Sequence, residues 1–334
     1  MVLSIWVTDS CNMCCEYCYE GRKTGKIMPV NYIESIVKFI RKVLPYSESD
    51  DLYVKFFGGE PLLNEGFIQA FIETIESNLK KDLKHVRYSI TTNGTMLNKD
   101  SVDYFERKKV ECSISLDGFP EVNNRHRKLK SGGNAWEAVN QNLDYIFKSN
   151  LKVAARMTYT SETVSFVSDS VKFLAERGFT TIILIPDFFD TKWTDEKFEQ
   201  LTKQYYEVKK YGRYHPEVDI CTGNVSYNPY KGYYGCGGGK NTFSIDVNGD
   251  IYPCTYAVEF EKFKLGDIFH WNDYKIVDYK TDHEQRKDCK GCKYFQICIS
   301  GRCIFLNYKA TGQFYKPGAC FCEYQKLEYK YLGI

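Results

Sequence analysis

The 334-residue sequence contains no apolar run long enough to cross a lipid bilayer. A secretory signal is also missing, because Asp9 and a group of cysteines arrive before an apolar signal segment could form. The net charge is only +2, so no excess of one sign points to nucleic acid or to an anionic membrane. These absences predict a cytoplasmic protein that binds neither nucleic acid nor a membrane.

Cysteine, in contrast, is abundant, with 14 residues in the chain. Four of them lie in residues 11–18, Cys112 and Cys221 are scattered, and eight fall between residues 236 and 322. In a reducing compartment such clusters favour metal binding over disulfides. The distribution predicts two separate metal-binding regions in a chain whose length fits one large or two medium domains.

Short β-rich runs alternate with amphipathic stretches up to about residue 185. The expected strands are Leu3–Thr8, Leu52–Phe57, Val86–Thr92, Val110–Leu116, Leu151–Thr158 and Thr180–Ile185. The expected helices are Asn31–Leu44, Glu65–Leu79, Lys99–Arg107, Ala135–Phe147 and Thr160–Arg177. This alternation predicts an α/β fold with a parallel sheet, open or closed into a barrel. The active site of such a sheet lies at the carboxyl ends of its strands.

Beyond the sixth strand the pattern changes to a polar helix over Lys192–Lys210 and then to a stretch rich in Tyr, Gly, Asn and Pro. The cysteine-rich remainder contains one β-hairpin over residues 242–252, with an Asn-Gly turn. We therefore expect a first domain over residues 1–215 and a small metal-stapled domain over residues 216–334.

Cys11, Cys15 and Cys18 lie directly after the first strand, with the spacing Cys-x3-Cys-x2-Cys. Three thiolates on one short loop would hold three irons of a cubane and leave the fourth iron open. An open metal position is typical of a catalytic site. Cys14 points in a different direction from its neighbour and is interpreted as a bystander. Spacing alone also permits a zinc loop or simply buried thiols.

The loop resembles the radical SAM (S-adenosylmethionine) signature Cys-x3-Cys-x-aromatic-Cys, with Tyr17 at the aromatic position. Three further motifs of that family follow at successive strand ends, namely Gly58-Gly59-Glu60-Pro61, Asn93 in Thr-Thr-Asn-Gly, and Ser115-Leu116-Asp117-Gly118 with Arg127. The family's usual His-Asp pair before that arginine is Asn123-Asn124 here.

The resemblance implies a partial (β/α)6 barrel and a 4Fe–4S cluster on Cys11, Cys15 and Cys18. It also implies SAM-binding residues: Tyr17, the backbone of Gly58, Gly59, Glu60 and Pro61 for the amino group, Asn93, Ser115, Asp117, and Arg127 for the carboxylate. The implied chemistry is reductive cleavage of SAM to methionine and a 5′-deoxyadenosyl radical, which takes a hydrogen atom from substrate. A flavodoxin- or ferredoxin-type protein is the implied electron donor.

The C-terminal cysteines resemble the SPASM domain, which carries two auxiliary 4Fe–4S clusters. By this resemblance Cys236, Cys254 and Cys303 bind the first cluster, and the second is bound by Cys289, Cys292, Cys298 and Cys320. Cys322 could replace Cys320. Four residues separate Cys298 from Cys303, where the family pattern has three. The alternative is zinc, for which Cys-x2-Cys knuckles are typical.

Cys221 lies 15 residues before Cys236 and is the candidate fourth ligand of the first auxiliary cluster. Two other roles stay open for it. A catalytic thiol could return a hydrogen atom to a substrate radical, and a buried thiol would have no role in the reaction.

SPASM proteins mostly modify peptides and proteins, so we expect hydrogen abstraction from a ribosomally made peptide, with or without a leader sequence. The product would be a thioether or other crosslink, or an epimerised residue. The Tyr-rich segment Tyr227–Tyr234 could contribute to peptide binding.

Three alternative functions compete with this one. An anaerobic sulfatase maturase usually has Asp and Gln where this chain has Thr255 and Phe57. A small-molecule radical oxidoreductase is also compatible with the motifs. A non-catalytic iron–sulfur or zinc scaffold is disfavoured, because it would not need the SAM-binding motifs.

Overall fold

The computed structural model of the protein describes residues 1–21, 23–47, 50–79, 81–222, 236–270, 277, 279 and 285–333. The segment Tyr227–Tyr234, expected to contact a peptide, lies outside these residues. Within the described ranges, no helix combines the length and the apolar character that a membrane span requires.

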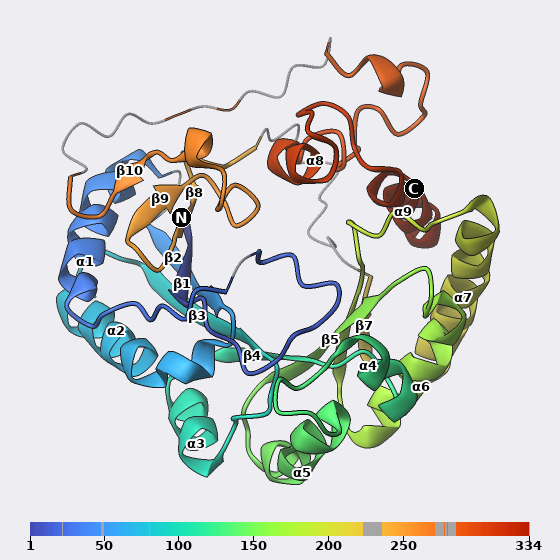
Figure 1. Cartoon of the computed structure of the whole chain (residues 1–334), viewed down its shortest axis with the longest axis horizontal. Helices are drawn as coiled ribbons and strands as arrows, with labels where there is room; N and C mark the ends of the chain where they lie inside the picture. Colours follow the sequence, from blue (N-terminus) through green and yellow to red (C-terminus); the bar gives the residue numbers. More distant parts are fainter. Residues whose placement is uncertain are drawn as a thin grey trace.

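Seven parallel strands curve into an open barrel with helices on its outer side (Figure 1). The strands are β1 (Val2–Thr8), β2 (Asp51–Gly58), β3 (His85–Thr92), β4 (Glu111–Ser115), β5 (Val153–Tyr159), β6 (Thr181–Pro186) and β7 (Asp219–Cys221). The helices are α1 (Tyr32–Val43), α2 (Glu65–Asn78), α3 (Lys99–Arg107), α4 (Pro120–His126), α5 (Ala135–Lys148), α6 (Val167–Arg177) and α7 (Asp195–Tyr214). The expected parallel α/β architecture is confirmed.

Strand β2 shows why this sheet has two different faces. Val54 and Phe56 are fully buried beneath the outer helices, whereas the alternating residues Lys55 and Phe57 are only partly buried and face the barrel interior. Successive side chains of a strand point to opposite faces of the sheet. A period-2 pattern in the sequence is therefore enough to produce an apolar outer face and a mixed inner face. The barrel interior is therefore lined with polar groups and is not filled by a second core.

The C-terminal module is attached to the barrel through the sheet itself. The predicted hairpin is formed by β8 (Thr242–Ile245) and β9 (Asp250–Tyr252), followed by β10 (Gly266–Asp267). Strand β8 pairs in parallel with β1, which makes one ten-stranded sheet in the order β10-β9-β8-β1-β2-β3-β4-β5-β6-β7. The module thus continues the barrel edge, as Figure 1 shows in orange.

At the opposite edge, β7 pairs in parallel with β6 and was not expected from the sequence. It lies just beyond residue 215, and the division of the chain there remains a proposal. The polar helix expected over Lys192–Lys210 is α7, which begins three residues later and ends four residues later. Helices α8 (Ile304–Thr311) and α9 (Ala319–Leu332) complete the chain near the open side of the barrel (Figure 1).

Candidate active site

The loop after β1 carries the three spaced cysteines and is fixed mainly by backbone hydrogen bonds. The amide of Cys14 donates to the carbonyl of Lys128 (2.9 Å), and the amide of Glu16 donates to the carbonyl of His126 (3.0 Å). The Cys14 thiol also contacts the Lys128 carbonyl, at 3.7 Å. The segment that follows β4 therefore holds the cysteine loop in place from one side.

Gly58 and Gly59 hold the same loop from the other side, where β2 ends. The amide of Gly59 donates to Thr8 O (2.9 Å), and the amide of Glu60 donates to Ser10 O (2.7 Å). A Cβ on Gly59 would lie 2.1 Å from Ser10 O, and Gly58 has φ +134°, so only glycine permits this close approach. Because the amides of Gly59 and Glu60 are used, these two residues can offer a ligand only their carbonyl oxygens, which would suit an ammonium group.

Glu60 acts as a buried connector between β2 and β3. Its carboxylate accepts hydrogen bonds from Thr92 Oγ1 (2.6 Å), the Asn93 amide (2.7 Å) and the Leu62 amide (3.1 Å). Burial raises its pKa to about 6, although these three hydrogen bonds oppose the shift. The Asn93 side chain in turn contacts Cys11 Sγ (3.9 Å). The Gly-Gly-Glu-Pro and Thr-Thr-Asn-Gly motifs therefore form one unit behind the cysteine loop.

A cavity of about 400 Å³ lies at the carboxyl ends of the strands. The sequence-predicted residues on its wall are Cys11, Cys15, Tyr17, Cys18, Gly58, Gly59, Asn93, Ser115 and Arg127. Glu60, Pro61 and Asp117, also predicted to bind SAM, are not on this wall. The structure thus brings together three cysteines and four SAM-motif segments around one space, which is the arrangement a cluster with bound SAM requires.

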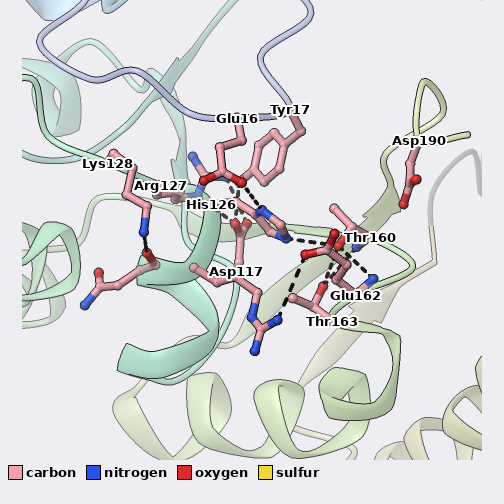
Figure 2. A network of polar contacts seen from close by, with 12 residues as sticks. Glu16, Tyr17, Asp117, His126, Arg127, Lys128, Thr160, Glu162, Thr163 and Asp190 are labelled. Carbon is pink, nitrogen blue, oxygen red and sulfur yellow. Dashed lines mark hydrogen bonds and ion pairs between the residues drawn. The ribbon is translucent and has the colours of Figure 1, made fainter. Parts of the chain in front are cut away.

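Asp117 is 1% exposed and forms the centre of a buried polar network (Figure 2). Arg127 donates to it through Nε (3.0 Å) and Nη2 (2.9 Å), and the Thr158 amide donates to it at 2.9 Å. The Tyr17 hydroxyl also donates to this carboxylate. The Arg127 fork, expected to face the SAM carboxylate, is thus directed at Asp117, and Asp117 itself positions Arg127 and Tyr17.

His126 and Glu16 form a second connection that the sequence motifs did not indicate. His126 Nδ1 lies 2.9 Å from Glu16 Oε2, and His126 Nε2 lies 3.1 Å from Thr160 Oγ1 (Figure 2). The His126 ring also packs edge-to-face on Tyr17, with ring centroids 5.7 Å apart. The cysteine loop is therefore tied to both α4 and the segment after β5.

The cysteines of this loop suit metal binding better than they suit free thiolate chemistry. Burial raises the pKa of the Cys11 thiol to about 11 and also raises that of Cys15. Thiols with raised pKa values stay protonated near neutral pH, whereas iron displaces their protons and stabilises the thiolates. These donors fit a cluster that supplies its own positive charge.

In the C-terminal module, Cys236, Cys254 and Cys303 form one group, although they are far apart in the sequence. Burial raises the pKa of Cys303 to about 12. Burial also raises the pKa of Cys254, and negative charge on Cys303 and Cys236 raises it further. Cys236 and Cys254 pack against a small apolar core, whereas Cys303 packs against the main core of the protein. The small core consists of Trp6, Val247, Tyr252, Ala257, Val258, Phe263, Ile304 and Phe305. This predicted set therefore lies together at the junction of barrel and module.

Cys320 and Cys322 point in opposite directions on α9. Cys322 lies near Cys289 and Cys298, whose charges both act on its pKa. Cys320 is 4% exposed and donates through Sγ to the Asp187 carbonyl at 3.5 Å. Residues two apart on a helix point in nearly opposite directions. The structure therefore places Cys322, and not Cys320, with the second predicted set.

Cys292 lies near the same group of cysteines, because Cys322 and Cys292 both raise the pKa of Lys326. A zinc site would need its ligands gathered around one ion. In the part of the chain that the structure describes, no three His, Cys, Asp or Glu side chains are close enough to hold one ion. A cubane assigns each thiolate to a different iron, so the thiolates of a cluster do not converge on one ion.

Cys221 is at the end of β7, at the sheet edge opposite to β8. Its thiol donates to Asp219 Oδ2 at 3.5 Å, and burial and Asp219 raise its pKa to about 11. Ligation of the first auxiliary cluster would require Cys221 to leave this contact.

Sequence reasoning missed several other residues on the cavity wall. Tyr19, Phe189 and Tyr256 form an aromatic side, with the Tyr19 ring 5.8 Å from Tyr256 and 6.2 Å from Phe189. Arg156 and Asp187 add charges of opposite sign. One signal was available, because Arg156 places a charge inside an otherwise uncharged strand, in the register that faces inward.

Comparisons with known proteins agree with this geometry. Residues 5–174 match the family model described as the radical SAM superfamily, and residues 236–293 match that of an iron–sulfur cluster-binding domain named SPASM. The cysteine-type anaerobic sulfatase-maturating enzyme of Clostridium perfringens strain 13 is 26% identical over 330 residues, which cover 88% of this chain and 86% of that protein. The radical SAM cyclopropyl synthase TigE of Paramaledivibacter caminithermalis is 23% identical, with 97% of this chain and 72% of that protein covered.

Solved structures share the whole fold. Native anSMEcpe with bound AdoMet and Cp18Cys peptide matches with a TM-score of 0.79 at 22% identity, covering 99% of this chain and 96% of that one. Streptococcus suis SuiB bound to its precursor peptide SuiA matches with a TM-score of 0.70 at 18% identity, covering 96% of this chain and 75% of that one.

Proposed function

This chain belongs to the radical SAM superfamily and carries a C-terminal SPASM domain, and from that premise we propose that it abstracts hydrogen from a peptide substrate. The modification we propose is a thioether or other crosslink, or an epimerised residue, in a ribosomally made peptide. A flavodoxin- or ferredoxin-type protein is the proposed electron donor.

One observation carries the proposal: the cavity wall combines the cysteine loop with an aromatic side to which both parts of the chain contribute. Tyr19 comes from the loop after β1, Phe189 follows β6, and Tyr256 belongs to the C-terminal module. Tyrosine and phenylalanine give large contact areas to peptide side chains at low entropic cost. Two of the structural neighbours, anSMEcpe and SuiB, are described with bound peptides, which supports a peptide as the occupant here.

Each group on the cavity wall has a defined task in this proposal. Cys11, Cys15 and Cys18 would hold a 4Fe–4S cluster that, with SAM bound, supplies the 5′-deoxyadenosyl radical. The Gly59 carbonyl would accept from the SAM ammonium group, and Ser115 and Asn93 would contact the rest of the cofactor. Asp117 keeps Tyr17 and Arg127 in position, and the buried network limits access of water to the reacting atoms.

For the auxiliary clusters we propose Cys236, Cys254 and Cys303 on the first; Cys221, expected from the sequence as its fourth ligand, contacts Asp219 instead and is left out of this proposal. On the second we propose Cys289, Cys292, Cys298 and Cys322, because α9 turns Cys322 toward this group. Both clusters would then lie within the module that borders the cavity.

A second candidate function is formylglycine formation in a sulfatase, because several similar curated proteins are sulfatase-maturating enzymes. Two residues argue against it. Phe57, on the cavity wall, stands where those enzymes usually have Gln, and Thr255 stands where they usually have the Asp proposed as the base.

The test uses anaerobically reconstituted, chemically reduced enzyme with SAM and two kinds of peptide. One kind is encoded by short open reading frames beside the gene, and the other is a synthetic sulfatase-type cysteine peptide. We expect 5′-deoxyadenosine in both mixtures. In the first we also expect loss of two hydrogens from the peptide, or solvent deuterium at one Cα. An aldehyde formed on the sulfatase peptide alone would support the second candidate instead.

A further inference from the structure

Arg156 occupies an unusual place in the barrel, at the junction of two cavities. In β5, Ala155 and Met157 are buried on the outer face, while Arg156 faces inward. Two cavities share Phe57, Thr91 and Arg156 on their walls. One is the upper cavity of 400 Å³ at the carboxyl ends of the strands, and the other is a cavity of 830 Å³ deeper in the barrel interior. A molecule that fills the upper cavity therefore reaches the guanidinium of Arg156 at its inner end.

Among the described residues, no hydrogen-bond acceptor contacts the Arg156 guanidinium and no carboxylate lies within the 4.0 Å of an ion pair. Other arginines of the barrel are paired: Arg127 binds Asp117, Arg87 binds Glu111, and Arg177 binds Asp144. A partly buried polar group without a partner calls for a functional explanation. Because Arg156 lies in a cavity wall, the functional explanation is that its guanidinium binds a ligand that enters the cavity.

The charges around Arg156 indicate whether that ligand is an anion or a cation. Lys55 faces the same interior from β2, and burial together with Arg156 lowers its pKa, so the two cations are close enough to repel. Of the carboxylates on the upper cavity wall, Glu20 is paired with Lys23 at 2.6 Å and Asp187 accepts from the Phe189 amide at 2.9 Å, and neither forms an ion pair with Arg156. The inner end of the cavity is thus positive and needs an anion.

The shape of an Arg site selects the chemistry of the anion. The planar fork of guanidinium matches a carboxylate through two parallel hydrogen bonds. Arg156 also faces the aromatic side of the cavity, since its charge acts on the hydroxyls of both Tyr19 and Tyr256. A ligand with a carboxylate beside an apolar or aromatic group would satisfy both surfaces.

We propose that Arg156 is a substrate-binding residue that grips a carboxylate of the peptide, either an Asp or Glu side chain or the C-terminal carboxylate. The modified residue would then lie beside Tyr19 and Tyr256, close to the cofactor. Only the identity of the molecule that carries the carboxylate rests on the proposed function. The anion subsite itself rests on the position of Arg156 in the cavity wall and on its lack of a partner among the described residues.

The test measures binding of small probes to SAM-loaded holoenzyme by saturation-transfer NMR. The probes are N-acetyl-glutamate N-methylamide for a side-chain carboxylate, N-acetyl-tyrosine for a terminal carboxylate, and their glutamine and N-methylamide counterparts as neutral controls. The variants are Arg156→Gln, Arg156→Lys and Arg177→Gln. Arg177 serves as the matched control, because its ion pair with Asp144 lies on the outer helices.

Wild type should prefer one carboxylate probe over its neutral counterpart by about tenfold or more, as expected for a charge-assisted pair. The probe that binds identifies the source of the carboxylate. Arg156→Gln should lose the preference, Arg156→Lys should keep part of it, and Arg177→Gln should retain it. Iron content and circular dichroism verify that each variant is folded.

Two results would overturn the proposal. Equal binding of acidic and neutral probes by wild type would show that no carboxylate subsite exists, and a tenfold loss of SAM affinity in Arg156→Gln would make Arg156 a cofactor ligand instead. Peptide turnover by the wild-type enzyme is measured separately. A carboxylate preference without turnover of any peptide would therefore reject the proposed function and leave the subsite standing.

Discussion

The two cysteine regions of this protein differ in how they are built. Cys11, Cys15 and Cys18 come from one loop of eight residues, held by backbone hydrogen bonds and a polar network, and they line an open cavity. The C-terminal cysteines come from distant segments, and one group of them lies against an apolar core. A short loop can present three thiolates and keep one metal position free, whereas distant segments can surround a metal and close its coordination.

This contrast separates a reactive site from a structural or electron-transferring one. The polar network around Asp117 positions groups toward the cavity without filling it. Apolar side chains pack against Cys236 and Cys254 instead, and apolar surroundings would tune the potential of a bound cluster. Substitutions in the two regions should therefore have different consequences.

The first prediction removes the reactive site completely. Wild type should hold three 4Fe–4S clusters, or about 12 iron atoms. Replacing Cys11, Cys15 and Cys18 together by Ala should remove about a third of that iron and all formation of 5′-deoxyadenosine. Cys14→Ala is the control and should retain both. Persistent SAM cleavage in the triple variant would contradict the assignment of this loop.

The second prediction concerns the buried Arg127–Asp117 pair. Arg127→Met should lower the free energy of unfolding by about 3 kcal/mol, because Asp117 is left buried without its cation. It should also weaken SAM binding while the clusters stay intact. Urea unfolding and SAM titration provide the two readouts. The double variant with Asp117→Asn should recover part of the stability, and a double variant as unstable as the single one would reject the pairing argument.

The third prediction uses the opposite faces of α9. Cys322→Ala should change the EPR or Mössbauer spectrum of one auxiliary cluster and lower its iron content, because Cys322 lies with Cys289 and Cys298. Cys320→Ala, the matched control two residues away, should keep all iron, since its thiol contacts the Asp187 carbonyl. The reverse result would mean that α9 is rotated relative to the module.

The fourth prediction concerns Glu328, also on α9, whose pKa is raised by burial from 4.5 to about 8. Between these values the folded chain binds more protons than the unfolded chain, so its stability falls as the pH rises. Glu328→Gln should remove this loss and raise the free energy of unfolding by about 1 to 3 kcal/mol at about pH 8, with a smaller gain near pH 5.

Urea unfolding at both pH values tests this prediction. Glu323→Gln, at an exposed ion pair on the same helix, is the control and should change stability little at either pH. A gain from Glu328→Gln that did not grow with pH would mean that the carboxylate is well solvated.

The smallest effect is expected for Cys221→Ala. The Cys221 thiol lies against Asp219 on β7, so we expect iron content, spectra and SAM cleavage to stay near wild type. A changed cluster spectrum would instead make Cys221 a ligand. Unchanged spectra with a lost or altered product would make it a hydrogen donor.

Those parts of the protein that depend on local spacing could be predicted from the amino-acid sequence. The alternation of period-2 and helical patterns placed six strands and four helices within two residues of their bounds, whereas α6 begins seven residues later than expected. The sequence pattern missed the short elements α4 and β7, because seven and three residues carry too little periodicity. Cys-x3-Cys-x2-Cys, Gly-Gly-Glu-Pro and Asn93 identified the cavity, since parallel strands end at the same edge and bring their following loops together.

Which side chain contacts which partner depends instead on how distant segments pack together. Glu60 and Asp117 belong to binding motifs, but Glu60 accepts from Thr92 on β3 and Asp117 accepts from Arg127 and from the Thr158 amide on β5. The proposal of Cys322 in place of Cys320 likewise rests on the orientation of α9. The pairing of β8 with β1 is likewise a contact between distant segments, and the position of Arg156 between two cavities depends on the closure of the barrel. Sequence periodicity records whether a residue is buried, but a partner far along the chain is fixed only when helices and strands pack against one another.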